Sequence, residues 1–119
     1  MPARADFLPH ILSDHLGWIA LLDVERSPLR FRYRLVGTGI TQAVGRDSTG
    51  RYLDELYEPD IYEIAASGFR RVVETQRPVR VQGKLEQVDK GFMRYEALEL
   101  PLSDDGVEVN MVMTRCHFD

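Results

Sequence analysis

The stretch Arg30-Phe31-Arg32-Tyr33-Arg34-Leu35 decides the fold class. Three apolar side chains alternate in it with three arginines, and a period of two is typical of a strand with one face in water. A short apolar run, residues 18–24, precedes it across a turn at Ser27-Pro28. The two segments therefore predict an antiparallel hairpin.

Helical spacing is found on both sides of this hairpin. Residues 7–16 carry an apolar stripe that Asp6 can cap and Gly17 can end. Residues 37–57 are broken by glycines, and short helices fit only at 40–44 and 52–57.

A longer helix is predicted from Asp60, which we expect to cap it, with Glu63 at the reciprocal capping position. Pro78 excludes any helix beyond it. Its polar side carries Glu63, Arg70, Arg71 and Glu74. Its apolar stripe is Ile61, Ile64, Ala65, Gly68, Phe69, Val72 and Val73.

Three strands are predicted after that helix. Residues 79–86 alternate, residues 89–91 form a hairpin turn, and residues 92–102 make a long strand. A turn at 103–106 leads into a last alternating strand from Val107 to Thr114. No repeat of strand, helix and strand is present, which argues against a parallel α/β sheet.

The predicted fold is therefore α+β: a five-stranded antiparallel sheet with helices packed on one face, plus an N-terminal helix. At 119 residues the chain is one domain, with a helical segment at 1–17 and the core at 18–119. The net charge of −4 argues against a nucleic-acid partner. Because no apolar run reaches about 20 residues and only one cysteine is present, we expect no membrane span and a cytoplasmic protein.

Several motifs together resemble a bacterial subfamily of PAS domains found mainly in alphaproteobacteria. The motifs are Leu21-Leu22-Asp23-Val24, the run from Phe31 to Thr38 (FRYRLVGT), the GRDSTGR run from Gly45 to Arg51, and Leu53-Asp54-Glu55-Leu56. The opening residues 2–6, Leu100-Pro101-Leu102 and Asp105-Gly106 also look like that subfamily. Members commonly carry a further helical stretch ahead of residues 2–6. That stretch is either missing from the protein or cut off by a late start.

The resemblance implies a sensor and interaction module whose sheet and helices enclose a small cavity. In such domains the cavity holds haem, flavin or a metabolite, or stays empty. A cysteinyl flavin adduct is not expected, because the 45–50 segment offers Ser48 and Thr49 but no thiol. Histidine-ligated haem is not expected either, because the helix from Asp60 has no histidine. His10 and His15, five residues apart, are a poor metal pair.

Catalysis is the alternative from another class. Asp23, Asp47 and Asp54 are the acids expected nearest the cavity, and a small isomerase or hydrolase would use one of them. No nucleophile–base order or phosphate loop supports this, so no catalytic residue is assigned.

Polar segments of the hairpin region have plain structural explanations. Arg30, Arg32 and Arg34 form an outer charged face, bind an anion or partner, or supply one arginine that pairs with Asp23 at a ladder irregularity. We interpret residues 45–51 as a turn in which Asp47 and Thr49 bond to nearby backbone N–H groups.

The leading hypothesis is a stand-alone signalling module that binds a small molecule or a protein partner and transmits by conformational change. A pure interaction domain with a filled pocket is the runner-up. The N-terminal helix would form a homodimer through Phe7, Ile11 and Leu12. The expected ligand contacts are Phe31, Tyr33, Leu35, Phe69, Val73, Tyr95, Leu98 and Met111.

Overall fold

The computed structural model describes residues 16–87 and 91–118, and within these ranges it describes the side chains of all residues except 16, 84–87 and 91–93. Most of the helix predicted over 7–16 lies outside this range, as does most of the turn predicted at 89–91. The proposed dimer contacts Phe7, Ile11 and Leu12 lie outside it as well.

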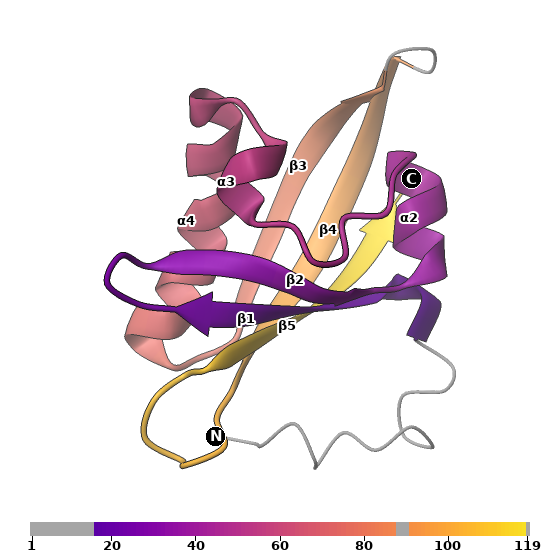
Figure 1. Cartoon of the computed structure of the whole chain (residues 1–119). Coiled ribbons are helices and arrows are strands. Elements are labelled where there is room, and N and C mark those ends of the chain that lie inside the picture. Colours follow the sequence, from indigo (N-terminus) through magenta and orange to yellow (C-terminus); the bar gives the residue numbers. More distant parts are fainter. Residues whose placement is uncertain (1–15, 88–90, 119) are drawn as a thin grey trace.

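Five antiparallel strands form one sheet in the order β2-β1-β5-β4-β3 (Figure 1). The first hairpin is β1 (Ile19–Glu25) with β2 (Arg30–Val36), and the later strands are β3 (Val79–Gln87), β4 (Gly91–Leu102) and β5 (Met111–Phe118). Pairing of β1 with β5 joins the ribbons from the two ends of the chain. The predicted α+β class and single five-stranded antiparallel sheet are therefore confirmed.

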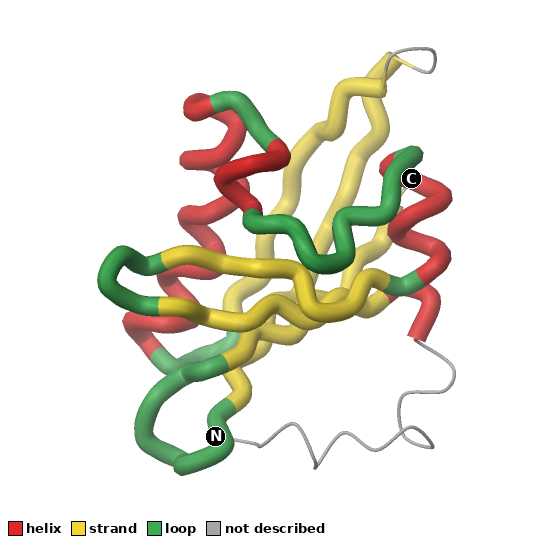
Figure 2. The backbone as a smooth tube through the Cα atoms, viewed as in Figure 1, coloured by secondary structure: helices red, strands yellow, loops and turns green. Residues whose placement is uncertain are grey.

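The helices lie between the two ribbons in sequence. A single 3₁₀ turn, η2 (Leu16–Trp18), leads into β1, and α2 (Thr38–Val44), α3 (Leu53–Leu56) and α4 (Pro59–Thr75) follow β2. Figure 2 shows α3 and α4 close together at one end of the β1–β2 hairpin and α2 at the other. Of the helices within the described ranges, none is long and apolar enough to span a membrane.

The start of α4 differs from the prediction. Its N-cap is Glu58, which makes no side-chain capping bond, and Pro59 opens the helix. Proline suits that position because the first N–H groups of a helix have no partner within it. Asp60 therefore lies inside the first turn, and Glu63 pairs with Arg70 at 2.8 Å.

The buried side of α4 is also narrower than the predicted stripe. Ala66, Gly68, Phe69 and Val72 are buried, whereas Ile61 is 46% and Ile64 66% exposed. At 100° per residue, Ile64 lies about 140° around the helix from Phe69. Ile61 and Ile64 are therefore not core residues.

The last strand begins four residues later than predicted, at Met111. The Asp105 carboxylate accepts hydrogen bonds from the Val107 N–H at 2.8 Å and the Glu108 N–H at 3.0 Å, and from the Ser103 hydroxyl at 2.8 Å. The N–H groups of Val107 and Glu108 therefore close a loop and do not pair with a strand. Val107 is 68% exposed and is not a core residue.

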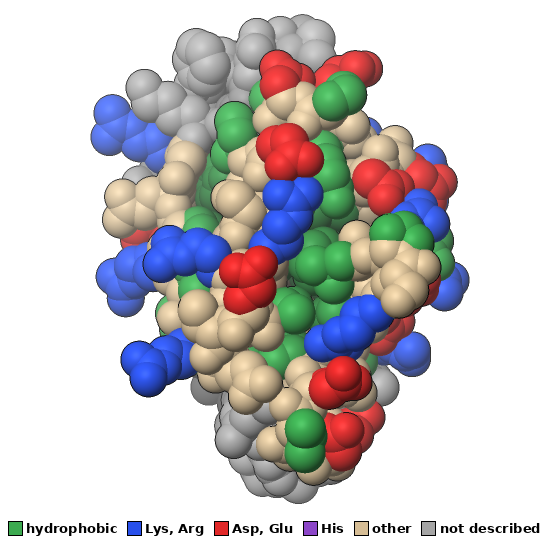
Figure 3. Space-filling model, turned by 90° about the vertical axis from the view of Figure 1, so that its left-hand side faces the viewer, with side chains coloured by type: hydrophobic (Ala, Val, Ile, Leu, Met, Phe, Trp, Pro, Cys, Tyr) green, Lys and Arg blue, Asp and Glu red, His purple; other side chains and the backbone are tan. Residues whose placement is uncertain are grey.

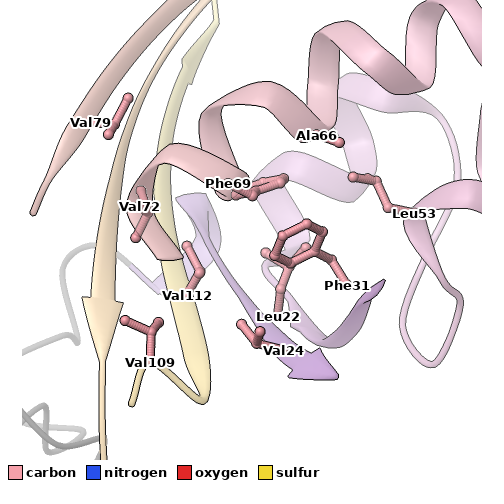
Figure 4. Close-up of a cluster of buried hydrophobic side chains, with 10 residues drawn as sticks. All are labelled: Leu22, Val24, Phe31, Leu53, Ala66, Phe69, Val72, Val79, Val109 and Val112. Atoms are coloured by element: carbon pink, nitrogen blue, oxygen red, sulfur yellow. The ribbon is translucent and has the colours of Figure 1, made fainter. Parts of the chain in front are cut away.

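Both faces of the sheet carry buried apolar side chains. The inner face is the one covered by α3 and α4, and Figure 4 shows ten side chains packed between it and these helices. On the outer face, a second cluster contains Ile19, Leu21, Leu102, Met111 and Met113. Apolarity alone therefore does not tell which face a residue occupies.

Candidate functional site

A polar row crosses the inner face of the sheet. Glu99 on β4 lies opposite Thr114 on β5 and Val79 on β3. Two residues along the strand, Ala97 lies opposite Cys116, and the thiol is 3.8 Å from the Thr114 hydroxyl. Strand alternation therefore places a carboxyl, a hydroxyl and a thiol side by side on the face that the helices cover.

Glu99 is the least expected member of this row. The residue is only 3% exposed, and within the described part of the chain its Oε1 atom has no hydrogen-bond partner. Gly68 of α4 lies directly against that oxygen: a Cβ atom at position 68 would collide with Oε1 and lie 2.9 Å from Val81 Cγ1. Glycine is therefore required for α4 to pack this closely on β4.

Burial controls the charge of this row. Loss of hydration raises the pKa of Glu99 to about 8, so its carboxyl keeps its proton at neutral pH. Burial also raises the pKa of Tyr33, Tyr95 and Cys116, and a negative charge on Glu99 would raise each of these pKa values further. At neutral pH the polar row is therefore uncharged.

Five of the eight expected ligand contacts share the inner side with Glu99. Phe31 and Phe69 are buried, with ring centroids 5.5 Å apart, and Tyr33 and Val73 pack against the same cluster. Tyr95 belongs to the β4 row and lies against Gly83 of β3. Glu99 is absent from the expected set. The sequence does carry one signal for it: Glu99 is two residues from Ala97 and four from Tyr95, and strand alternation places residues at these spacings on the same face.

The other three expected contacts lie elsewhere. Between Leu21 and Leu22 the β1–β2 register shifts, so Arg34 is an extra residue and Leu35 pairs with Leu21 instead of continuing the Phe31–Tyr33 row. Leu35 is consequently 43% exposed. Leu98 and Met111 are on the outer face, because they alternate with the inner residues of β4 and β5.

Leu98 instead lines a shallow, open groove of ≈ 290 Å³ on the outer face. Small-molecule pockets are usually deeper and reach about 300–1,000 Å³. The groove is lined by Arg80, Glu96, Ala97, Leu98, Arg115 and His117. Its depth and position separate it from the polar row under α4.

The three arginines of β2 each have a partner within the chain. Arg30 forms two 2.8 Å hydrogen bonds with the Asp54 carboxylate and lies 3.6 Å over the Tyr52 ring. Arg32 donates to the Gly50 carbonyl at 3.2 Å. Arg34, at the register shift, donates to Asp23 at 2.9 Å. Of the three alternatives, the pairing with Asp23 at a ladder irregularity is therefore present, but the Arg34 side chain stays exposed and does not turn inward.

The segment from Gly45 to Arg51 is a structured turn, as predicted. The Asp47 carboxylate accepts from the Thr49 N–H at 3.0 Å and from its hydroxyl at 2.7 Å. Gly45 and Gly50 have φ values of 90° and 84°, which glycine adopts at little cost. Asp23, Asp47 and Asp54 are therefore all engaged in local bonds, and none faces the polar row.

A family model described as "PAS domain" matches residues 1–114. The chain therefore belongs to the PAS domain family, a family of sensory modules. No curated protein matches the sequence.

Solved structures agree on the fold. A light-oxygen-voltage (LOV) domain studied with a flavin analogue superposes with a TM-score of 0.69 at 15% identity, over 97% of this chain and 87% of that one. A LOV protein of Rhodobacter sphaeroides superposes with a TM-score of 0.64 at 12% identity, over 84% of this chain and 57% of that one. The PAS domain of a Colwellia psychrerythraea protein superposes with a TM-score of 0.60 at 13% identity, over 88% of this chain and 91% of that one.

The residues present do not fit a covalent flavin or a haem ligated from α4. The only thiol, Cys116, is in a strand beside Thr114, and α2 and the turn after it contain none. No histidine is present in α4, and His117 lines the groove on the outer face. No group of three or more His, Cys, Asp or Glu side chains suited to a metal occurs within the described ranges.

Proposed function

We propose that this PAS domain is a signalling module that binds a small molecule or a protein partner and responds at the interface between α4 and the inner face of the sheet. The observation that carries the proposal is the Glu99 carboxyl, which is buried under α4 with an oxygen that nothing in the described chain satisfies. Folded proteins pair nearly all buried polar atoms, so an exception of this kind calls for an explanation.

A ligand group supplies one explanation. Leaving a buried acceptor without a partner costs about 1–3 kcal/mol. Because Gly68 lies against Oε1, a ligand reaches this oxygen only when α4 moves away from β4. In that position a small molecule with an N–H or O–H group would remove the cost, and Tyr33, Phe69, Val73 and Tyr95 lie on the same side of the sheet as apolar or aromatic contacts. The expected ligand is therefore a largely apolar molecule with one hydrogen-bonding group.

The position of Glu99 also suggests how binding is transmitted. β4 is bonded to β5 and β5 to β1, so the sheet is one continuous unit. α4 is held to that unit by side-chain packing at Gly68, Phe69 and Val72. Occupancy near Glu99 would shift the population between two positions of α4.

A second candidate function rests on the core itself. The ten-residue cluster in Figure 4 fills space between the sheet, α3 and α4 with the chain's own side chains. If no ligand enters, the protein is a pure interaction domain whose interior is filled by its own side chains. An isomerase or hydrolase is not favoured, because Glu99 lies beneath a helix and not at the mouth of an opening that substrate can reach.

We further propose a setting for the module, based on its sequence. We place it in the bacterial, mainly alphaproteobacterial subfamily of PAS domains and in the cytoplasm. We propose a homodimer formed through Phe7, Ile11 and Leu12, without a nucleic acid or membrane partner, and a signalling protein as its protein partner.

Native mass spectrometry of the purified full chain tests the proposal. We expect a small molecule bound to the chain, released on denaturation, with reduced occupancy in the Glu99→Met variant, which removes the acceptor oxygen. Glu96→Met is the matched control, because Glu96 is exposed on the same strand and faces the other way. A bare chain in all three samples would contradict ligand binding and leave the filled-interior function.

A further inference from the structure

We propose that the contact between Gly68 on α4 and the Glu99 carboxyl on β4 is a proton-linked switch. The helix is docked on the sheet while the carboxyl holds its proton, and docking weakens when the carboxyl ionises. This inference rests on the proposed function, because it names how the same interface is regulated.

Close packing makes the contact sensitive to charge. Gly68 has no side chain to hold a water molecule over Oε1, and the space where a Cβ would lie is already bounded by Oε1 and Val81. Val79 and Thr114 flank Glu99 across the sheet. Water therefore cannot hydrate the Oε1 atom of an ionised carboxyl while α4 stays in place.

Among the residues that the structure describes, the groups facing Glu99 offer no compensating positive charge. Tyr33 from β2, Tyr95 from β4 and Cys116 from β5 all interact electrostatically with it, and each is neutral when protonated. Tyr57, in the segment before α4, interacts with the same two tyrosines. From α3 and α4, the inner cluster receives apolar side chains.

Two arginines interact electrostatically with members of this group. The charge of Arg46 lowers the pKa of Tyr33, but its guanidinium donates to the Leu56 carbonyl at 3.1 Å and lies 5.6 Å over the Tyr57 ring. Arg115 acts on Cys116, and its side chain lines the outer groove. Neither contributes to the pKa shift of Glu99, which burial alone causes.

Movement of α4 is the easiest way to relieve an ionised Glu99. Backbone hydrogen bonds hold β4 between β3 and β5 along most of its length. The contact of α4 with the sheet consists of side-chain packing around Gly68, Phe69 and Val72. Opening of α4 exposes Glu99 without breaking any strand pairing, so charge on one residue is converted into the position of one helix.

Linkage gives the sign and size of the effect. In the docked state the pKa of Glu99 is about 8, and in the open state it returns toward its ordinary value of 4.5. Between these values the open state binds fewer protons, so the equilibrium constant for α4 opening rises with pH. The rise is up to about tenfold per pH unit, and it levels off above the higher value.

Hydrogen exchange of the full chain from pH 5.5 to 8.5, corrected for intrinsic exchange, tests the switch. We expect α4 amides of the wild type to lose up to about 100-fold protection over two pH units below 8 and to exchange faster than the β4 and β5 amides at every pH, because α4 opens without global unfolding. Glu99→Gln should abolish the pH dependence, and the exposed control Glu96→Gln should retain it.

If the protection of α4 amides changes with pH in the same way in the wild type and in Glu99→Gln, the switch is overturned. If Glu99→Gln does not fold, the wild type alone still decides, because α4 amides as well protected as those of β4 and β5 throughout the range would show that α4 opens only by global unfolding, and this would also overturn the switch. A bare mass in the native spectrum together with pH-dependent α4 exchange would refute ligand binding and keep the switch. A bound ligand together with pH-independent α4 exchange would support ligand binding and refute the switch.

Discussion

At the scale of single residues, the two-residue alternation of β4 turns Glu99 inward while its neighbours Leu98 and Leu100 face out. The inward position removes the carboxyl from water, and Gly68 allows α4 to seal it there. One acidic side chain and one missing side chain thus define the contact on which the proposed signalling depends.

Adding a single methyl group at position 68 tests this packing. We expect Gly68→Ala to lower the free energy of unfolding by about 1–3 kcal/mol, the usual cost of overpacking a filled core. Urea denaturation measures it. Ser67→Ala is the control, since Ser67 is exposed and should change stability by less than about 0.5 kcal/mol. Equal effects of the two substitutions would argue against the tight contact.

The pH dependence of global stability is a second test at this scale. The folded-state pKa of Glu99 is raised from 4.5 to about 8, so the folded state binds more protons than the unfolded state between these values. Stability contributed by this group is therefore full below pH 4.5 and falls as pH rises toward 8, by up to about 1.4 kcal/mol per pH unit.

Urea unfolding at pH 5.5, 6.5 and 7.5 measures this slope. The difference in unfolding free energy between the wild type and Glu99→Gln should shift with pH in favour of the variant. A difference that is constant across the three pH values would show that Glu99 ionises alike in the folded and unfolded chains.

Glu99 also shows what sequence patterns leave open. Alternation predicts that Tyr95, Ala97 and Glu99 share one face and that the leucines at 98, 100 and 102 share the other. A row of leucines suggests the core, whereas the helices cover the row that contains the acid. Because both faces bury apolar side chains, only the tertiary structure distinguishes them.

At the scale of elements, the bulge at Arg34 decides which β2 side chains enter the core. One extra residue reverses the alternation, so Phe31 is 1% and Leu35 43% exposed although four positions separate them. The sequence predicts the strand and its alternating pattern. It offers an Asp23 pair at a ladder irregularity only as one of three alternatives and does not tell which arginine is the extra residue, because that depends on the register with β1.

A pair of truncations in β2 tests the bulge. Phe31→Ala should cost about 3–5 kcal/mol, because it removes a buried ring from the inner cluster. Leu35→Ala should change stability by less than about 0.5 kcal/mol, as is usual for an exposed site. Chemical denaturation of both variants decides the matter, and similar losses would mean that Leu35 is buried and the alternation unbroken.

Other elements were predicted in kind but not in their boundaries. The helix starting at Pro59, the turn at Gly45–Arg51 and both hairpins follow from local residue types. The late start of β5 depends on the Asp105 carboxylate taking backbone amides, which strand alternation does not reveal. Which face of α4 is buried depends on its packing against the sheet, which the helical pattern of the sequence does not contain.

At the scale of the whole molecule, β1 and β5 lie at the centre of the sheet and join the ribbons from opposite ends of the chain. The order of elements predicts this arrangement, and the family match over residues 1–114 agrees with it. Seen from the side where α3 and α4 lie, the surface shows hydrophobic side chains between charged ones (Figure 3). Exposed Ile61 and Ile64 belong to α4.

Association of two chains is a further prediction at this scale. Sedimentation of the full chain at micromolar concentration should give twice the 13.7 kDa chain mass. Ile11→Glu should shift the mass toward a monomer, because it places a charge in the predicted apolar contact. A monomeric wild type would exclude the dimer and leave output to a second protein.

The measurement that bears most directly on the account is an NMR titration of the Glu99 side-chain carboxyl in the full chain. We predict a midpoint at about pH 8, with α4 amide shifts that follow the same curve. A midpoint near 4.5, the ordinary value, would show that the carboxyl is hydrated or paired in solution and would contradict the sealed contact under α4.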